Sequence, residues 1–118
     1  MTVDSVDLTP AQRRHLRELV GLPYWWPRNG PERRCAEAMA RKALVVFNPS
    51  RGAPQFELTR RGREAFVALA VVKHPAPWRV ESDWTEEVID ADGRCVAKCR
   101  TRENAERLVA LANGGDAR

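Results

Sequence analysis

Arginines recur at helical spacing between residues 31 and 43 of the sequence. On a helical wheel of 100° per residue, Arg33, Arg34 and Arg41 lie on the side opposite the apolar residues Cys35 and Met39. A guanidinium group binds a guanine edge through two parallel hydrogen bonds and also neutralises phosphate. The pattern predicts a helix whose polar face binds nucleic acid, with an ordinary solvated helix face as the alternative.

Five more basic residues lie at positions from which they could bind phosphate. Lys42 stands at the edge of the same helix, and Arg51 falls in a turn-rich loop. Arg60, Arg61 and Arg63 fall in the first turn of a further expected helix. Positive charge is unfavourable there, because the helix dipole is already positive at its N-terminus. We therefore expect these cations to bind another group, and phosphate is the candidate.

Three adjacent aromatic residues, Tyr24, Trp25 and Trp26, precede an Asn-Gly turn signal. They could form an exposed patch that binds a protein partner or stacks on bases. The alternative is an irregular segment that fills the gap between two helices.

Other chemistry is not indicated. Cys95 and Cys99 lie four residues apart in an expected strand, about 13 Å at ~3.3 Å per residue, too far for a disulfide. Neither histidine shows metal-ligand spacing, and Asp90 and Asp92 flank a turn that explains them. We expect no enzyme activity, no metal and no cofactor. The cysteines Cys35 and Cys95 should be buried, and Cys99 should be a free thiol or likewise buried.

Composition sets the class of molecule. The 118 residues are 43% hydrophobic and 31% charged, with a formal net charge of +4. Residues 1–72 hold 12 Lys and Arg against 7 Asp and Glu, so the positive excess belongs to the front of the chain. No apolar run approaches the ~20 residues of a membrane span, and the start lacks the apolar segment of a signal peptide. A reduced, cytoplasmic setting in a bacterial host cell is expected.

The front part, residues 1–72, should contain three helices and one β-hairpin. Helices are expected over 9–20, 31–43 and 60–71, and the hairpin over 44–58. Thr9 and Thr59 are expected N-caps, and Gln12 completes a capping box with Thr9.

This order of elements resembles a winged helix-turn-helix domain of bacterial and phage type. The matching segments are Leu8-Thr9-Pro10-Ala11-Gln12-Arg13-Arg14, Arg41-Lys42-Ala43-Leu44-Val45 and Phe56-Glu57-Leu58-Thr59-Arg60-Arg61-Gly62-Arg63. The resemblance implies that helix 31–43 is the recognition helix and that the loop near Arg51 is the wing. Such domains place a full helix between the first and the recognition helix, whereas here only Tyr24 to Gly30 fill that position.

The rear part, residues 78–118, follows a Pro-containing linker at 73–77. Strands are expected at 78–80, 84–90 and 94–100, with Asp92-Gly93 as a two-residue hairpin turn that pairs Ile89 with Val96. A helix over 102–113, with Thr101 as its expected N-cap, should cover the sheet face that holds Trp84, Val88 and Ala97. The apolar face with Ile89 and Val96 should also be covered, by the front part or by a second chain.

The rear pattern is similar to a small ββα module of many uncharacterised phage proteins. The segments that carry this similarity are Trp78, Asp90-Ala91-Asp92-Gly93, Val96-Ala97 and Leu111-Ala112-Asn113. It implies an origin in a phage or mobile element and no defined activity.

The sequence therefore predicts an α+β protein with a winged-helix domain followed by a ββα module. The first hypothesis is a non-enzymatic regulatory protein that binds double-stranded DNA, with a homodimer formed through Ile89 and Val96. The second is a phage-encoded inhibitor, similar in role to an anti-CRISPR, that binds a host protein or ribonucleoprotein complex through the aromatic residues 24–26.

Overall fold

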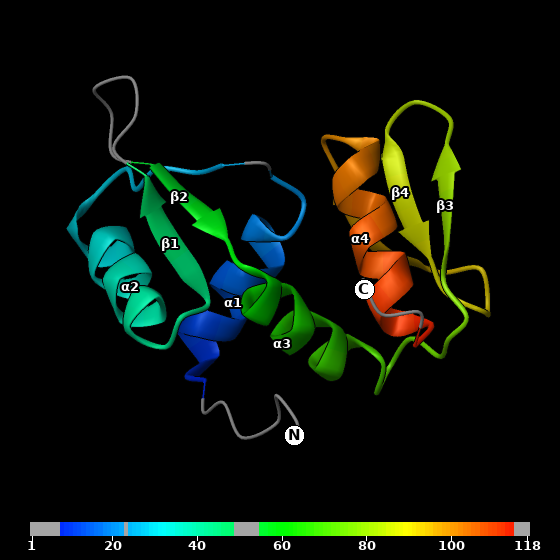
Figure 1. Ribbon diagram of the computed structural model, residues 1–118, viewed down its shortest axis with the longest axis horizontal. Helices are drawn as coiled ribbons and strands as arrows, with labels where there is room; N and C mark the ends of the chain where they lie inside the picture. The colour runs from blue at the N-terminus through cyan, green and yellow to red at the C-terminus, as the bar shows by residue number, and fades with distance from the viewer. Residues whose placement is uncertain (1–7, 23, 49–54, 115–118) are drawn as a thin grey trace.

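A computed structural model describes residues 8–22, 24–48 and 55–114. Within these residues the chain is an α+β protein with four helices and two small antiparallel sheets. Helices α1, α2 and α3 pack around the two-stranded sheet, and α4 lies against the three-stranded sheet on the side that faces α3 (Figure 1). No helix of the described part has both the length and the apolar character of a membrane span.

The front helices begin and end close to the predicted residues. They are α1 Pro10–Leu19, α2 Gly30–Arg41 and α3 Arg60–Ala70. Thr9 caps α1 in the expected capping box with Gln12, and Thr59 caps α3 by accepting the N–H of Gly62. The start of α2 differs from the prediction, because Asn29 accepts the N–H of Glu32 and acts as N-cap rather than as part of a turn.

The predicted front hairpin is present, and a single residue of the aromatic segment pairs with its outer edge. Strands β1 Val45–Asn48 and β2 Gln55–Leu58 pair antiparallel, with Phe47 opposite Phe56. On the other side of β2, Trp25 and Phe56 exchange both backbone hydrogen bonds, at 2.9 and 2.6 Å. The aromatic segment is therefore attached to the sheet edge.

The rear sheet has the order β3-β4-β5 and is followed by α4. The elements are β3 Arg79–Ser82, β4 Glu86–Ile89, β5 Cys95–Cys99 and α4 Arg102–Ala112. Thr101 caps α4 as expected. Val88, Ala105 and Leu108 are fully buried in one cluster, which confirms that α4 covers this sheet face.

The turn between β4 and β5 is longer than the predicted two-residue hairpin. The Asp90 N–H donates to the Arg94 carbonyl at 2.9 Å, which leaves residues 91–93 as a three-residue loop. Gly93 has a φ of 86°, the left-handed conformation that the third position of such a loop requires. The prediction of a two-residue turn at Asp92-Gly93 is wrong for this reason.

The longer loop shifts the strand register. Val88 pairs with Ala97 as predicted, but Ile89 pairs with Cys95 rather than with Val96, so β5 carries one extra residue. Cys95 lies beside this irregularity and is exposed, so the prediction that it is buried is wrong.

The two remaining cysteines differ in burial. Cys35 is half-buried and Cys99 is buried. Burial, with smaller effects from Cys95 and Glu86, raises the pKa of the Cys99 thiol to about 11. Cys99 therefore stays a neutral thiol at physiological pH.

The two rear tryptophans differ in burial, and Trp84 departs from its prediction. Trp84, expected on the covered face, is 97% exposed because β4 begins only at Glu86 and residue 84 lies in the connection from β3. Trp78 is instead buried, and its indole N–H donates to the His74 carbonyl at 2.8 Å. Asn113 closes the same region by hydrogen bonds to the Trp78 backbone N–H and carbonyl.

The rear part packs directly on the front part, as predicted. One hydrophobic cluster includes Leu16 and Phe66 of the front helices together with Trp78 and Leu108. The Arg100 N–H donates to the carbonyl of Gly21 at 2.7 Å. A Cβ at Gly21 would lie 2.0 Å from the Lys98 carbonyl oxygen, so only glycine permits this approach.

Candidate nucleic-acid interface

Helix α2 presents its arginines to solvent. Ala36 and Met39 are fully buried against the core, whereas Arg33, Arg34 and Arg41 are exposed on the other side. The predicted division of this helix into an apolar and an arginine-bearing face is therefore confirmed.

The three α2 arginines differ in their contacts. Arg33 Nε lies 3.4 Å from a Glu37 carboxylate oxygen, an exposed ion pair one turn along the helix. Arg34 and Arg41 make no hydrogen bond or ion pair with any residue that the structure describes. They are seven residues apart, which places them within about 20° on the helix and about 10 Å apart along its axis. Two guanidinium groups thus lie in line with all their donors available.

The basic residues at the end of α2 and the start of α3 bind groups of the chain itself. Lys42 Nζ donates to Gln12 Oε1 at 2.8 Å. Arg61 Nε donates to the Lys42 carbonyl at 3.2 Å, and Arg60 Nε forms a 3.0 Å ion pair with Glu64. These contacts explain why arginines occur at an unfavourable helix N-terminus, since Arg61 binds a carbonyl that the end of α2 leaves without an intrahelical partner.

Arg63 is half-buried, whereas Arg60 and Arg61 are exposed. Its Nη1 donates to the Leu58 carbonyl at 3.2 Å. Burial, followed by the positive charges of Arg107 and Arg60, lowers the pKa of its guanidinium. The side chain points toward the rear part of the chain and is not on the α2 surface. Arg51, the predicted wing residue, lies outside the described residues.

Helix α1 carries a second arginine-rich face that the sequence reasoning missed. Arg13, Arg14 and Arg17 are exposed, and none of them forms an ion pair with a described residue. The helical wheel that identified the α2 face would also have found this one, because the three residues span about 100° opposite the buried Leu16 and Leu19. The 2.8 Å bond from Lys42 to the first turn of α1 joins the two helices at one end.

The aromatic segment is partly packed against the core and partly exposed. Trp25 is half-buried against the core and lies edge-on to the His15 ring, with 4.3 Å between centroids. Tyr24 and Trp26 point away from the core, are 46% and 48% exposed, and stack on each other at 5.7 Å. Alternation along an extended segment produces this division.

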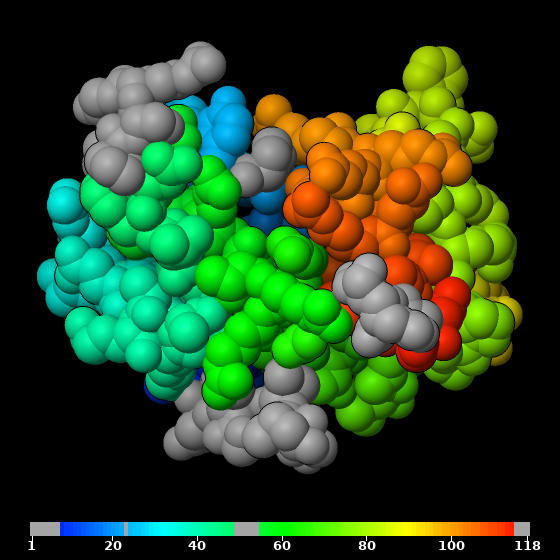
Figure 2. Space-filling model, in the orientation of Figure 1, coloured from blue at the N-terminus to red at the C-terminus, as the bar shows by residue number. Residues whose placement is uncertain are grey.

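Tyr24 and Trp26 line a cavity at the junction of the front and rear parts. Its volume is about 410 Å³, and its other walls include Leu22, Arg28 and Arg100. A second cavity of about 440 Å³ shares Leu22 and Arg100 and extends to the exposed Trp84. Figure 2 shows the front part, coloured blue to green, beside the orange helix α4 of the rear part.

Ile89 and Val96, the predicted dimer contact, both pack within a single chain. Ile89 is only 5% exposed, and Val96 is half-buried against the core. The prediction that this apolar face is covered is therefore confirmed for Ile89, which the chain itself buries, whereas Val96 stays partly exposed.

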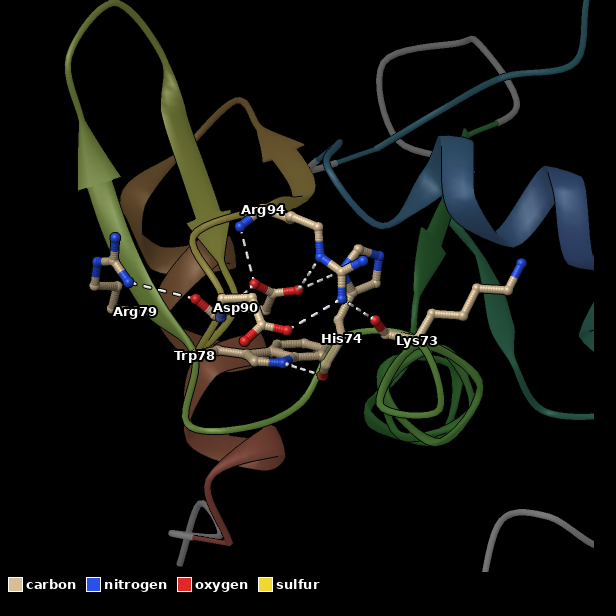
Figure 3. A network of polar contacts seen from close by, with 7 residues as sticks. Lys73, His74, Trp78, Arg79, Asp90 and Arg94 are labelled. Carbon is tan, nitrogen blue, oxygen red and sulfur yellow. Dashed lines mark hydrogen bonds and ion pairs between the residues drawn. The ribbon is translucent and has the colours of Figure 1, made fainter.

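A buried carboxylate organises the loop after β4 (Figure 3). Asp90 is fully buried, and its Oδ1 accepts the N–H groups of Asp92 and Arg94, each at 2.9 Å. Its Oδ2 lies 2.8 Å from His74 Nδ1 and 3.4 Å from Arg94 Nε. Burial alone would raise the pKa of Asp90, but the hydrogen bonds from Arg94, His74 and Asp92 outweigh it and lower that pKa.

This Asp90 network attaches the predicted linker to the rear hairpin. Arg94 also donates to the Lys73 carbonyl at 2.7 Å, and the Ala91 N–H donates to the Pro75 carbonyl at 2.9 Å. Within the described residues His74 has no hydrogen bond to a hydroxyl or thiol. The histidine–aspartate pair connects the linker to the loop after β4.

No group of three or more His, Cys, Asp or Glu side chains in the described part of the chain could hold a metal ion. The described residues include an arginine face on α2, a second arginine face on α1 and an aromatic cavity at the junction. No protein-family model, curated protein or solved structure matches the chain.

Proposed function

We propose that this chain is a non-enzymatic regulatory protein that binds double-stranded DNA, with α2 as the helix that enters the major groove. The observation that carries this proposal is the pair Arg34 and Arg41, exposed in line on α2 without a partner among the described residues. An α-helix fits the major groove, and arginine is the residue that most often recognises guanine there.

The surrounding fold supports the same assignment. The order α1, α2, hairpin, α3 resembles a winged helix-turn-helix domain, in which a helix before the hairpin contacts bases. Trp25, which lies between α1 and α2, pairs with Phe56 and so adds one strand residue to the edge of the hairpin. Arg33 adds a third exposed positive charge to α2, which suits contacts to the phosphate backbone.

A direct binding measurement tests this function. Fluorescence anisotropy of a labelled random duplex, titrated with protein at several salt concentrations, should show binding that weakens steeply as salt increases. The logarithm of the affinity should fall by about 0.9 units per phosphate contact for each unit of log salt. The absence of binding at low salt would refute the proposal.

A second candidate function, binding of a protein partner, is favoured by a different observation. Tyr24 and Trp26 are half-exposed beside a cavity of about 410 Å³, and Trp84 is almost fully exposed near the adjoining one. Exposed aromatic residues of this kind often anchor protein interfaces. A host-complex inhibitor would use this surface, and exchange of Tyr24 and Trp26 for serine would then abolish its inhibition while DNA affinity stays unchanged.

A further inference from the structure

A small third cavity lies where α3, β2 and α4 meet. Its volume is about 60 Å³. A cavity of this size holds a few water molecules, and hence a small ion, but no base or sugar ring. In Figure 2 green segments lie beside the orange helix α4, and residues of β2, α3 and α4 line the cavity.

Three of the side chains that line this cavity carry N–H donors. Its walls include the guanidinium groups of Arg63 and Arg107 and the side-chain amide of Asn104. Asn104 Nδ2 is buried and has no hydrogen-bond acceptor among the described residues. A buried amide donor normally has a partner, so Asn104 Nδ2 is a donor that a ligand in this cavity could use.

The charge of the cavity selects an anion. Burial and the proximity of Arg107 both lower the pKa of Arg63, so two like charges face one small space. Glu57 also lines the cavity, but it accepts a hydrogen bond from Asn48 at 2.9 Å and forms no ion pair with a described arginine. Arg107 is bound at 2.7 Å by Glu103, which is not part of the cavity wall.

We propose that this cavity binds one phosphate group, with Arg63, Arg107 and Asn104 as its donors. Two guanidinium groups and an amide match the several acceptor oxygens of a tetrahedral oxyanion. The phosphate is either free inorganic phosphate or the terminal phosphate of a nucleic acid strand. The site does not depend on DNA binding by α2, because it uses none of that helix's residues.

The test measures the melting temperature in sodium phosphate against sodium chloride of equal ionic strength. At ten times its dissociation constant, phosphate should raise the melting temperature by on the order of 5 °C. Arg107→Gln and Asn104→Leu should abolish this difference. Arg102→Gln, which removes an exposed charge elsewhere on α4, should retain it and so controls for general salt effects.

A gain-of-binding variant keeps the proposal testable even if the loss variants fold poorly. Glu57→Gln removes the one carboxylate of the cavity wall and should increase phosphate affinity severalfold, seen as broadening of the phosphorus-31 NMR signal at lower protein concentration. No shift with phosphate in the wild type, or equal shifts in Arg107→Gln and Arg102→Gln, would overturn the site.

The same assay separates the two sources of phosphate. A 5′-phosphorylated dinucleotide that stabilises the protein more than inorganic phosphate, while its unphosphorylated form does not, would assign the site to a strand end. Stabilisation by inorganic phosphate alone would assign it to the free ion. Arg34→Ala with Arg41→Ala should leave either response unchanged, so the failure of DNA binding and the failure of this site are distinguishable.

Discussion

Helices α2 and α3 each carry three arginines, yet the two sets make different contacts. Every arginine of α3 binds a carboxylate or a backbone carbonyl of the chain itself. On α2 only Arg33 has such a partner among the described residues. The sequence alone makes both sets candidates for phosphate binding. The difference shows that an arginine near the end of another element stabilises the fold, whereas one on an outer helix face keeps its donors for a ligand.

The largest expected effect is a loss of stability when α3 can no longer pack closely against the segment after α2, where the α3 arginines find their partners. A Cβ at Gly62 would lie 2.3 Å from the Leu44 carbonyl oxygen, so Gly62→Ala should destabilise the protein by about 1–3 kcal/mol or more. Urea unfolding measures this loss. Alanine normally stabilises a helix relative to glycine, so the predicted sign opposes intrinsic propensity.

The matched control is Gly30→Ala in α2. There the nearest atom to a new Cβ is the flexible end of Arg34, at 3.4 Å. Its stability should stay within about 0.5 kcal/mol of wild type. Equal stability of the Gly62 and Gly30 variants would contradict the close contact between α3 and the segment after α2.

Loss of the N-cap of α3 should also lower the stability more than loss of the N-cap of α2. The Thr59 hydroxyl accepts the Gly62 N–H at 3.0 Å and donates to the Ala43 carbonyl at 2.6 Å, so it joins α3 to the end of α2. Thr59→Ala should cost about 1–2 kcal/mol, and Thr59→Ser should restore most of it. Asn29→Ala, at the exposed cap of α2, should cost about 0.5–1 kcal/mol. A larger loss for Asn29 in thermal unfolding would reverse the comparison.

A stabilising variant probes the end of α2. Ala43 has a φ of 63°, in the left-handed region that favours glycine. Ala43→Gly should therefore stabilise the protein by about 1 kcal/mol, measured as a higher urea midpoint without a change in slope. A lower midpoint would show that the alanine methyl group contributes packing that outweighs its strain.

The pH dependence of stability tests the core beneath α2. Burial is the main cause that lowers the pKa of His15 below its ordinary value, although Glu18 and Glu32 oppose it. The unfolded chain then binds the proton more readily. The stability that the neutral, buried His15 provides is therefore fully present above the ordinary histidine pKa of about 6.5. It is lost as the pH falls from there toward the pKa of His15 in the folded chain.

The variant His15→Gln separates this titration from others. Its unfolding free energy should change less than that of the wild type between pH 7 and pH 5. The lowered pKa of Asp90 acts in a separate window, since the stabilisation from its carboxylate is lost only below about pH 4. Parallel pH profiles for the variant and the wild type would show that His15 is not a buried neutral side chain.

Much of the fold follows from local chemistry that the sequence displays. Thr9, Thr59 and Thr101 cap three helices where predicted, because a hydroxyl followed by a helical pattern is a strong start signal. The front hairpin also lies where β-branched and aromatic residues alternate. The rear loop was mispredicted because the Asp90 carboxylate stabilises a three-residue loop that the Asp92-Gly93 pair does not reveal.

The candidate site was predictable only in part. The wheel of α2 separates its arginines from Met39 correctly, and the same wheel would have found Arg13, Arg14 and Arg17 of α1. The contacts of Arg61 and Arg63 depend on how α3 approaches α2 and β2, which no local pattern specifies. The cavity at Asn104 likewise arises from segments far apart in the sequence.

The central claim is that the α2 arginines, rather than those of α3, bind DNA. The most direct measurement compares duplex affinity and its salt dependence for Arg34→Ala/Arg41→Ala and for Arg60→Ala/Arg61→Ala, two variants that lose the same charge. The α2 variant should lose about 1–3 kcal/mol per base contact or about one unit of salt slope per phosphate contact. The α3 variant should bind within about threefold of wild type, because its side chains already bind the chain itself. Equal losses in both variants, or a loss confined to the α3 variant, would contradict the account.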